Sequence, residues 1–389
     1  MSKIVFFCIP AHGHTNPTLG VVRELISRNN EVWYYSYESM RNKIEETGAH
    51  FIPCDAYDPQ THLKQEDVAR LGHDLAFSTN LIVDITLALD DAIIDDMKSL
   101  QPDVIVSDSM AFWGKLIAKK MNIQFVSSTT TFAFNRYSAK VMKQGGAGII
   151  SMLWALPKIN HSLNRLRTKG YNVKSVLDIV ANDNNTNTIV YTSQKFQPCA
   201  DTFSDRYTFV GPILREPKEQ IEKDDRPMVY ISLGTVDNNN QSFYRNCMTA
   251  LTGEDYRVII SVGENTDIEA LGCIPKNCIV VPYVDQPAVL SVTDIFLTHC
   301  GMNSVSEALY YGVPLVLYPL TPEQQGVANR VHELGAGQFL KGTSPEEIQD
   351  IIKNVLNNAS IRDNAKIISD SFHRCGGAKA AADFIEGLL

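Results

Sequence analysis

Short apolar runs alternate with amphipathic helical segments along this chain, and this alternation constrains its fold more than any other feature. Residues 4–9 form a strand-like run, and residues 19–26 then repeat apolar side chains at helical spacing. We expect that helix to begin with Asn16 as its N-cap and Pro17 as its first residue. Further strand-like runs lie at residues 32–37 and 103–107. Such alternation is typical of parallel sheets covered by helices on both faces, so we predict an α/β fold.

A second series of the same kind begins after Pro227. Its strand-like runs lie at residues 228–233, 257–262, 278–282, 294–297 and 314–318. Residues 211–226, which separate the two series, are rich in Pro, Lys, Glu and Asp and have the composition of a solvated linker. We therefore predict two Rossmann-like, doubly wound parallel-sheet domains that face a cleft, over residues 1–210 and 227–370. In such sheets, ligands bind outside the carboxyl ends of the strands.

Charge, cysteine pattern and hydropathy exclude several classes of protein. Asp and Glu total 44 against 35 Lys and Arg, a net charge of -9, which argues against a nucleic-acid partner. The sequence has no CxxC pair, zinc-ligand spacing, P-loop, GxGxxG or GxSxG motif. The longest apolar run, residues 147–157, is shorter than the ~20 residues needed to span a bilayer. With no recognisable signal peptide, we expect a cytoplasmic protein without stable membrane insertion.

Two histidines and one aspartate are candidate catalytic residues of the first domain. His12 and His14 follow the first strand, and a His is suited to general-base catalysis because its pKa lies near neutrality. Asp108 ends a later strand, and we expect it to orient the imidazole of His14 if the two strands are neighbours. Alternatively, the histidines cap the helix or hydrogen-bond in a loop, or bind a metal, for which no further ligand set is evident. The alternative for Asp108 is a solvated strand end or an N-cap.

In the second domain, the segment His299-Cys-Gly-Met-Asn-Ser304 directly follows a strand. We expect Gly301 to permit a sharp turn, and Asn303 and Ser304 to open a helix. The N-terminus of that helix would bind a phosphate, with His299 as an additional donor. Glu307, one turn into the helix, could accept hydrogen bonds from a ribose. The alternative is that Asn303 and Ser304 are ordinary helix caps.

Three further patches stand at strand ends of the same domain. They are the glycine-containing loop Ser232-Leu-Gly234-Thr235, the segment Tyr283-Val284-Asp285-Gln286 and the pair Glu323-Gln324. We expect them to contact phosphate, nucleobase and sugar hydroxyls, respectively. Each alone is more typical of a turn, but their common placement favours a binding site. The sequence has no Asp-x-Asp pair to hold a metal on a diphosphate. Helix N-termini would then bind the diphosphate directly, and we expect no metal or cofactor.

Taken together, these motifs resemble those of the family 1 glycosyltransferases of the GT-B fold, and of their bacterial macrolide glycosyltransferase-like branch in particular. The resemblance runs from the first strand to the last helix and is most specific over residues 283–324. It implies an inverting, UDP-dependent hexosyltransferase that moves a sugar, with glucose from UDP-glucose as the first expectation, to a hydroxyl of a small hydrophobic acceptor. A macrolide, a flavonoid or another polyphenol would be such an acceptor. The resemblance also implies that a C-terminal helix, about residues 371–389, packs back on the first domain.

By this resemblance, His14 is the general base and Asp108 its orienting carboxylate. The residues at the family's donor-binding positions are Ser232, Gly234, Thr235, Tyr283, Val284, Gln286, His299, Gly301, Asn303, Ser304, Glu307, Glu323 and Gln324. Two positions depart from the family's pattern. Tyr283 replaces the Trp of plant members but keeps an aromatic ring, and Asp285 replaces the usual Pro, which puts the shape of that loop in doubt.

We expect the acceptor to bind the first domain. The candidate contacts are His12, Trp113, Phe132, Phe134, Met152 and Trp154. The alternative for the apolar members of this set is an ordinary core position. Contact of residues 149–156 with a membrane surface is a third interpretation of that apolar run.

Two other functions stay open at this point. A nucleotide-sugar epimerase or hydrolase on the same architecture would turn over the donor without an acceptor. A non-catalytic nucleotide-sugar-binding protein would not need the pair of His14 and Asp108. UDP and dTDP as donor nucleotides, and a monomer and a dimer, also remain alternatives.

Overall fold

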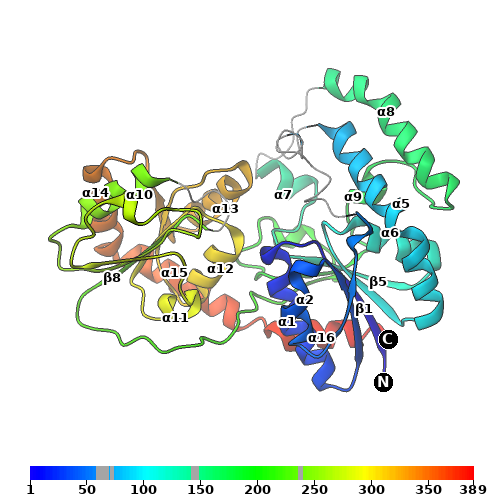
Figure 1. The fold of residues 1–389 in the computed structure, drawn as a ribbon, viewed down its shortest axis with the longest axis horizontal. Coiled ribbons are helices and arrows are strands. Elements are labelled where there is room, and N and C mark those ends of the chain that lie inside the picture. The colour runs from blue at the N-terminus through cyan, green and yellow to red at the C-terminus, as the bar shows by residue number, and fades with distance from the viewer. Residues whose placement is uncertain (58–69, 71–73, 142–148, 235–239) are drawn as a thin grey trace. The chain divides into compact units, whose positions relative to one another are not determined.

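The computed structural model describes residues 1–57, 70, 74–141, 149–234 and 240–389, with the side chains of 140, 141 and 149–155 excepted (Figure 1). The chain divides into two compact units. The first unit comprises Met1–Tyr191, Cys199–Ile213 and Gly376–Leu389. The second comprises Thr192–Pro198 and Leu214–Cys375. Each unit is built around its own parallel sheet.

The first unit contains a sheet of strand order β3-β2-β1-β4-β5-β6-β7, in which every neighbouring pair is parallel. Its strands are β1 (Lys3–Phe7), β2 (Glu31–Ser36), β3 (His50–Pro53), β4 (Val104–Asp108), β5 (Gln124–Thr129), β6 (Asn187–Val190) and β7 (Tyr207–Phe209). Its helices are α1 (His12–Ser27), α2 (Arg41–Glu45), α5 (Leu75–Leu100), α6 (Phe112–Met121), α7 (Arg136–Val141), α8 (Ile149–Thr168), α9 (Leu177–Val180) and α16 (Gly377–Glu386). Short 3-10 turns lie at Glu38–Met40, Asp55–Tyr57 and Ala200–Thr202.

Alternate residues of β1 enter two different hydrophobic cores, which shows that both faces of the sheet are buried. Ile4 and Phe6 pack with residues of α1 and α16 on one face. Val5 and Phe7 pack with residues of α5, α6 and α8 on the other. Since successive strand residues point to opposite faces, a continuous apolar run is what such a central strand requires.

The first helix begins earlier than we predicted. α1 starts at His12 with Ala11 as its N-cap, and Pro17 lies buried inside the helix. The backbone N–H groups of His14 and Thr15 donate to the carbonyl of Ala11 at 3.0 and 2.9 Å, so helical turns already form before the proline. The fixed φ of proline suits a helix, and near the N-terminus its missing N–H removes only one intrahelical bond. His12 and His14 therefore belong to the first turn of α1 rather than to a loop.

The second unit contains a parallel sheet of order β10-β9-β8-β11-β12-β13. Its strands are β8 (Met228–Ser232), β9 (Arg257–Ser261), β10 (Cys278–Val281), β11 (Ile295–Thr298), β12 (Leu315–Leu317) and β13 (Gly337–Phe339). Its helices are α10 (Gln241–Leu251), α11 (Gln286–Leu290), α12 (Met302–Tyr310), α13 (Pro322–Glu333), α14 (Pro345–Leu356) and α15 (Ala359–His373), with a 3-10 turn at Glu269–Leu271. Residues of α10 and α14 share a core with β8, β9 and β11.

The C-terminal helix belongs to the first unit, although α15 just before it belongs to the second. In Figure 1, α16 lies beside α1, and its apolar side chains Ala381, Ala382 and Ile385 enter the core beneath α1. Arg28 at the end of α1 is ion-paired with Asp383 at 2.6 Å and Glu386 at 2.8 Å. Burial of the apolar face, with these ion pairs at its edge, fixes the last helix on the first unit.

Candidate active site

The strand order places His14 and Asp108 on neighbouring strands of the first sheet. From β1 the sheet runs to β2 and β3 on one side and to β4 and later strands on the other. The carboxyl ends of β1 and β4 therefore form the point where the connections diverge, which is where open α/β sheets bind ligands. His14 lies in the first turn of the helix after β1, and Asp108 is the last residue of β4.

The side chains of His14 and Asp108 are joined by a direct hydrogen bond. His14 Nδ1 lies 2.9 Å from Asp108 Oδ1, and the hydroxyl of Thr130 lies 3.1 Å from the same nitrogen. The Asp108 side chain is fully buried, whereas that of His14 is 20% exposed. Because a carboxylate only accepts hydrogen bonds, Nδ1 must carry the hydrogen, and Nε2 is then the nitrogen that can take a proton. This arrangement is that of a general base with an orienting carboxylate.

Close packing holds the Asp108 backbone in place. A Cβ on Gly114 of α6 would lie 2.3 Å from Ser107 Oγ, so α6 sits against β4 in a way that only glycine permits. The Ser107 hydroxyl donates to Ala111 O at 2.8 Å, and Ala111 N donates to Asp108 O at 2.8 Å. Among the described residues, Asp108 Oδ2 has no hydrogen-bond partner although it is buried. An unpaired buried carboxylate oxygen costs stability, which is a feature of functional sites.

His12 occupies a different environment from His14. It is exposed, and its Nδ1 lies 3.1 Å from Lys43 Nζ. Partial burial and then the positive charge of Lys43 lower the pKa of His12. The neutral imidazole can accept a hydrogen bond from the lysine, so His12 is held at the rim of the first turn.

The second sheet repeats the same arrangement at β8 and β11, its own point of divergence. Gly234 follows β8, and His299 and Gly301 follow β11. A Cβ on either glycine would lie 2.6 Å from the imidazole of His299, so both backbones closely approach this ring. Gly301 has an extended φ of -61°, and the left-handed residue of the turn is Cys300, with φ 68°. Our prediction that Gly301 makes the sharp turn is therefore wrong: the glycine supplies space for His299, not a positive φ.

The N-terminus of α12 lies directly beyond this turn. Gly301 is the N-cap, with no side-chain bond at the cap, and Asn303 and Ser304 fall in the first turn. They are therefore not the N-cap residues that the alternative interpretation requires. The first backbone N–H groups of a helix lack intrahelical partners and carry a partial positive charge, which suits an anion. Ser232 Oγ accepts from Gly234 N at 3.3 Å in the neighbouring loop, and Thr235 lies outside the described residues.

Glu307 is the centre of a buried hydrogen-bond network. Gln286 Nε2 donates to Glu307 Oε2 at 2.6 Å, and the Tyr230 hydroxyl donates to Gln286 Oε1 at 3.0 Å. Burial raises the pKa of Glu307, and the hydrogen bond from Gln286 opposes that rise. Tyr283 of the same segment exposes 52% of its surface, and Val284 is half-buried. The structure thus joins Gln286 and Glu307, which sequence reasoning had placed in separate patches.

Glu323 and Gln324 begin α13. Gln324 forms a capping box with Thr321, because its Oε1 accepts from the backbone N–H groups of Leu320 and Thr321 at 2.8 and 3.1 Å. Glu323 is exposed. In this structure Gln324 therefore has a structural function in addition to any contact with a ligand.

The candidate acceptor residues differ in their exposure. Trp113 is 2% exposed within the core of α5, α6 and α8, and Phe132 is 1% exposed, so both have the burial of core residues. Phe134 is 39% exposed. The side chains of Met152 and Trp154 lie outside the part of the chain that the structure describes.

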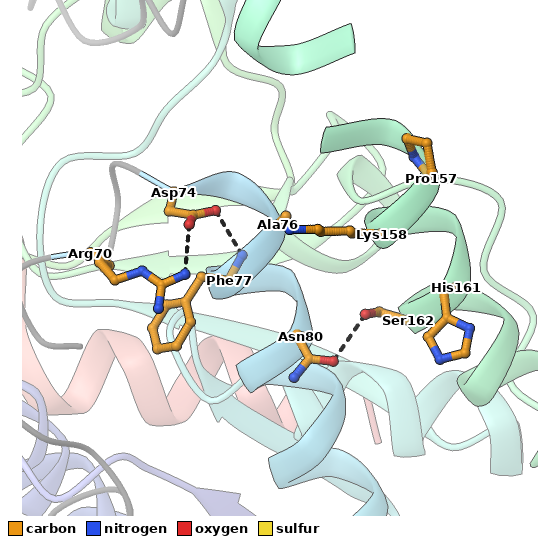
Figure 2. Close-up of a pocket in the computed structure, with 9 residues that line it drawn as sticks. All are labelled: Arg70, Asp74, Ala76, Phe77, Asn80, Pro157, Lys158, His161 and Ser162. Atoms are coloured by element: carbon orange, nitrogen blue, oxygen red, sulfur yellow. Dashed lines mark hydrogen bonds and ion pairs between the residues drawn. The ribbon is translucent and has the colours of Figure 1, made fainter. Parts of the chain in front are cut away.

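One pocket of about 460 Å³ in the first unit is lined, among the described residues, by none of the individual site residues predicted from the sequence (Figure 2). It lies between α5 and α8 and combines basic, acidic and apolar side chains. Arg70 is ion-paired with Asp74 at 2.8 Å and lies 4.2 Å from the centre of the Phe77 ring. Ser162 of α8 donates to Asn80 of α5 at 3.1 Å. Helical periodicity identifies α5 but not which helix packs on it, so the sequence carried no signal for this pocket.

Among the residues that the structure describes, no group of three or more His, Cys, Asp or Glu side chains could hold a metal ion. Within the same residues, no helix has the length and apolar character to cross a bilayer.

Comparison with known proteins identifies the family. The model of the family "UDP-glucoronosyl and UDP-glucosyl transferase" matches residues 212–376. The uncharacterised UDP-glucosyltransferase YojK of Bacillus subtilis is 33% identical over 99% of this chain and 97% of its own. Demethyllactenocin mycarosyltransferase of Streptomyces fradiae is 30% identical over 100% of this chain and 87% of its own.

Solved structures agree with this relationship. The calicheamicin glycosyltransferase CalG4 has a TM-score of 0.80 and 26% identity, covering 100% of this chain and 98% of its own. The similarity spans both units, each with its parallel sheet. The chain therefore belongs to the family 1 glycosyltransferases, in the bacterial macrolide glycosyltransferase-like branch, and is a GT-B enzyme of the hexosyltransferase type.

Proposed function

We propose that this enzyme transfers a hexose, glucose in the first instance, from a UDP-sugar to a hydroxyl of a small hydrophobic acceptor, with inversion at the anomeric carbon and without a metal ion. The observation that carries the proposal is the bond between His14 Nδ1 and Asp108 Oδ1, 2.9 Å long, at the carboxyl ends of two adjacent strands. Nucleotide binding alone would not need this pair. The pair of His14 and Asp108 therefore favours a transferase over a non-catalytic binding protein.

His14 is proposed as the general base. Nε2 removes the proton of the acceptor hydroxyl as its oxygen attacks the anomeric carbon from the face opposite the nucleotide, and the bond to the diphosphate breaks. The buried Asp108 carboxylate stabilises the imidazolium that forms. General-base assistance of this kind contributes about a 10²- to 10⁴-fold rate gain.

The second unit is proposed to bind the donor. The N-terminus of α12 and the imidazole of His299 would hold the diphosphate and stabilise the charge that grows on it as the bond breaks. Glu307 would accept hydrogen bonds from the ribose hydroxyls. Tyr283, whose ring is half exposed, would stack on the nucleobase. Glu323 and Gln324 would contact the sugar.

The acceptor is proposed to bind the first unit, with Phe134 as an exposed aromatic contact. Macrolides, flavonoids and other polyphenols are the proposed substrate classes. The mycarosyltransferase relative, whose name indicates a macrolide-type acceptor, supports the first of these. We propose a cytoplasmic location, where nucleotide sugars are made.

A mass-spectrometric screen tests the proposal. Hydroxylated aromatics and macrolides are incubated with UDP-glucose, other UDP-sugars and dTDP-sugars, and a mass increase of one hexose identifies acceptor and donor together. Release or isomerisation of the sugar in mixtures that lack an acceptor, with no glycosylated product in any mixture, would instead support a hydrolase or an epimerase.

The variant His14→Ala tests the catalytic base. Transfer is expected to fall by at least about 10²-fold because the general base is lost. UDP binding, measured by titration calorimetry, is expected to stay at the wild-type level, since His14 belongs to the first unit. Equal loss of transfer and of UDP binding would contradict the role of His14 as base.

A further inference from the structure

Asp285, the residue before α11, binds the segment that links the two sheets. Its side chain is only 8% exposed, and one carboxylate oxygen is ion-paired with Arg215. The other oxygen accepts from the backbone N–H of Lys218 at 2.5 Å and of Glu219 at 3.3 Å. Asp285 is the N-cap residue of α11, but its side chain makes no capping bond there. The carboxylate is therefore directed to the linker.

These contacts fix a segment that has no regular secondary structure of its own. Residues 214–226 contain no helix or strand, and residues 215–220 are all exposed. The two backbone N–H groups donate to a carboxylate, and such charge-assisted hydrogen bonds are the stronger kind, while Arg215 adds the opposite charge. At the far end of the segment, Lys223 is ion-paired with Asp294 at 2.7 Å. The linker is thus held on the second unit, with Arg215 at the Asp285 end.

The same carboxylate lies next to the Glu307 network, because Asp285 immediately precedes Gln286, which donates to Glu307 at 2.6 Å. Charges on both members of the ion pair act on Glu307. Burial raises the pKa of Glu307, and the hydrogen bond from Gln286 and the positive charge of Arg215 both oppose that rise, whereas the charge of Asp285 adds to it. Asp285 thus holds in place a cation that favours the ionised form of Glu307.

We propose that Arg215, held by Asp285 next to the hydrogen-bonded pair of Gln286 and Glu307, is a positioning residue for nucleotide binding: its positive charge supports the Glu307 carboxylate that accepts the hydroxyls of the donor's ribose. The proposal rests on the donor site described under the proposed function. It assigns a role in donor recognition to a linker residue and to the carboxylate that holds it.

The test is titration calorimetry of UDP with the full-length wild type, Arg215→Gln and a matched control, Arg226→Gln. Arg226 lies in the same linker and is also ion-paired, with Asp224 at 2.6 Å, but that pair is exposed and local. Removing the Arg215 charge favours protonation of Glu307. As the pH falls, Glu307 of the variant therefore takes up its proton at a higher pH than Glu307 of the wild type. We expect Arg215→Gln to bind UDP roughly three- to tenfold more weakly at about pH 5.5 and nearly as tightly as wild type at about pH 8. Arg226→Gln should match wild type at both. The ionisation of UDP itself cancels in these ratios.

A second variant separates the charge from a purely structural role. Arg215→Lys keeps the positive charge but loses the planar fork, so we expect its pH dependence of UDP binding to resemble that of wild type. Two results would overturn the proposal. In one, Arg215→Gln binds UDP more weakly than wild type by the same factor at both pH values. In the other, Arg215→Gln binds UDP as tightly as wild type at both. Failure of the wild type itself to bind UDP would overturn the proposed donor site and this inference with it.

Discussion

The variant Asp108→Asn isolates the electrostatic part of the proposed catalytic pair. Asparagine has nearly the same shape as aspartate, and its amide oxygen can still accept the hydrogen of His14 Nδ1, which lies 2.9 Å from Asp108 Oδ1. The tautomer of His14 can thus be kept while the negative charge is removed. The imidazolium that forms when Nε2 takes a proton then lacks its counter-ion.

The size of the effect follows from the geometry. For charge centres about 5 Å apart and an effective dielectric constant of about 20, Coulomb's law gives about 3 kcal/mol. Each ~1.4 kcal/mol of barrier is a factor of ten in rate, so kcat should fall about 10²-fold. The Michaelis constant for the donor should not change, because the donor residues belong to the second unit.

Stability should respond in the opposite direction to activity. Asp108 is fully buried, and among the described residues its Oδ2 has no hydrogen-bond partner. While His14 is uncharged, the buried Asp108 carboxylate has a desolvation cost that no opposite charge offsets, and a neutral amide of the same shape lowers this cost. We therefore expect the thermal midpoint of Asp108→Asn to equal or exceed that of wild type.

Initial rates at saturating donor and acceptor, with thermal unfolding followed by circular dichroism, provide both measurements. Asp103→Asn is the matched control: Asp103 precedes the same strand at its opposite end, where its carboxylate accepts from Lys3 N at 2.8 Å. This control should leave kcat within about twofold of wild type, as for most substitutions away from a site. If Asp108→Asn also retained wild-type kcat, or lost activity only together with its fold, the electrostatic reasoning would be refuted.

Two further predictions concern the second unit. Gly301→Ala places a Cβ 2.6 Å from the His299 ring and should raise the Michaelis constant for the donor about tenfold or more. Gly253→Ala is the control: its Cβ would meet nothing within 4 Å, and its φ of +77° strains only the local backbone, so stability should fall but the Michaelis constant should not change. Equal Michaelis constants for the two variants would contradict the assigned packing. Glu307→Gln should weaken UDP binding but raise the thermal midpoint, because burial raises the pKa of Glu307 and the ionised form destabilises the fold above that pKa. This gain in the thermal midpoint should disappear once the pH falls below the ordinary pKa of a glutamate side chain, because Glu307 is then protonated in the folded and the unfolded state. A gain that does not depend on pH would argue against burial of the Glu307 charge.

Most strands of both sheets coincide with runs predicted from the sequence, but β3, β5, β6, β7 and β13 were not predicted. β1, β2, β4 and β8 to β12 coincide with apolar runs, because a strand buried on both faces must be apolar throughout. Of the strands that were not predicted, β3, β6, β7 and β13 have only three or four residues each, whereas β5 has six and is polar at Gln124 and over residues 127–129. β6 begins with Asn187 and Thr188, which are polar and buried. Such strands are identified by their neighbours in the sheet and not by their own composition.

The site residues were predictable as positions, whereas their contacts were not. Alternation of strands and helices put His14 and Asp108 at carboxyl ends of strands, but 94 residues separate them. Only the strand order, with β4 directly beside β1, brings them together. The same holds for Gly234 and His299, which follow β8 and β11. Local periodicity carries no information on strand order. These contacts could therefore be identified only from the three-dimensional fold.

The linker shows why composition can give the right exposure and still miss a function. Residues 211–226 are rich in charged residues and Pro, which predicts a solvated segment, and residues 215–220 are indeed exposed. Yet Arg215 is ion-paired with a carboxylate that is only 8% exposed, beside the buried Glu307. An average over a segment describes its solvation, but recognition depends on one side chain and its partner. Because that partner, Asp285, stands directly before α11, far from Arg215 in the sequence, the composition of the linker carries no information on how the linker is held.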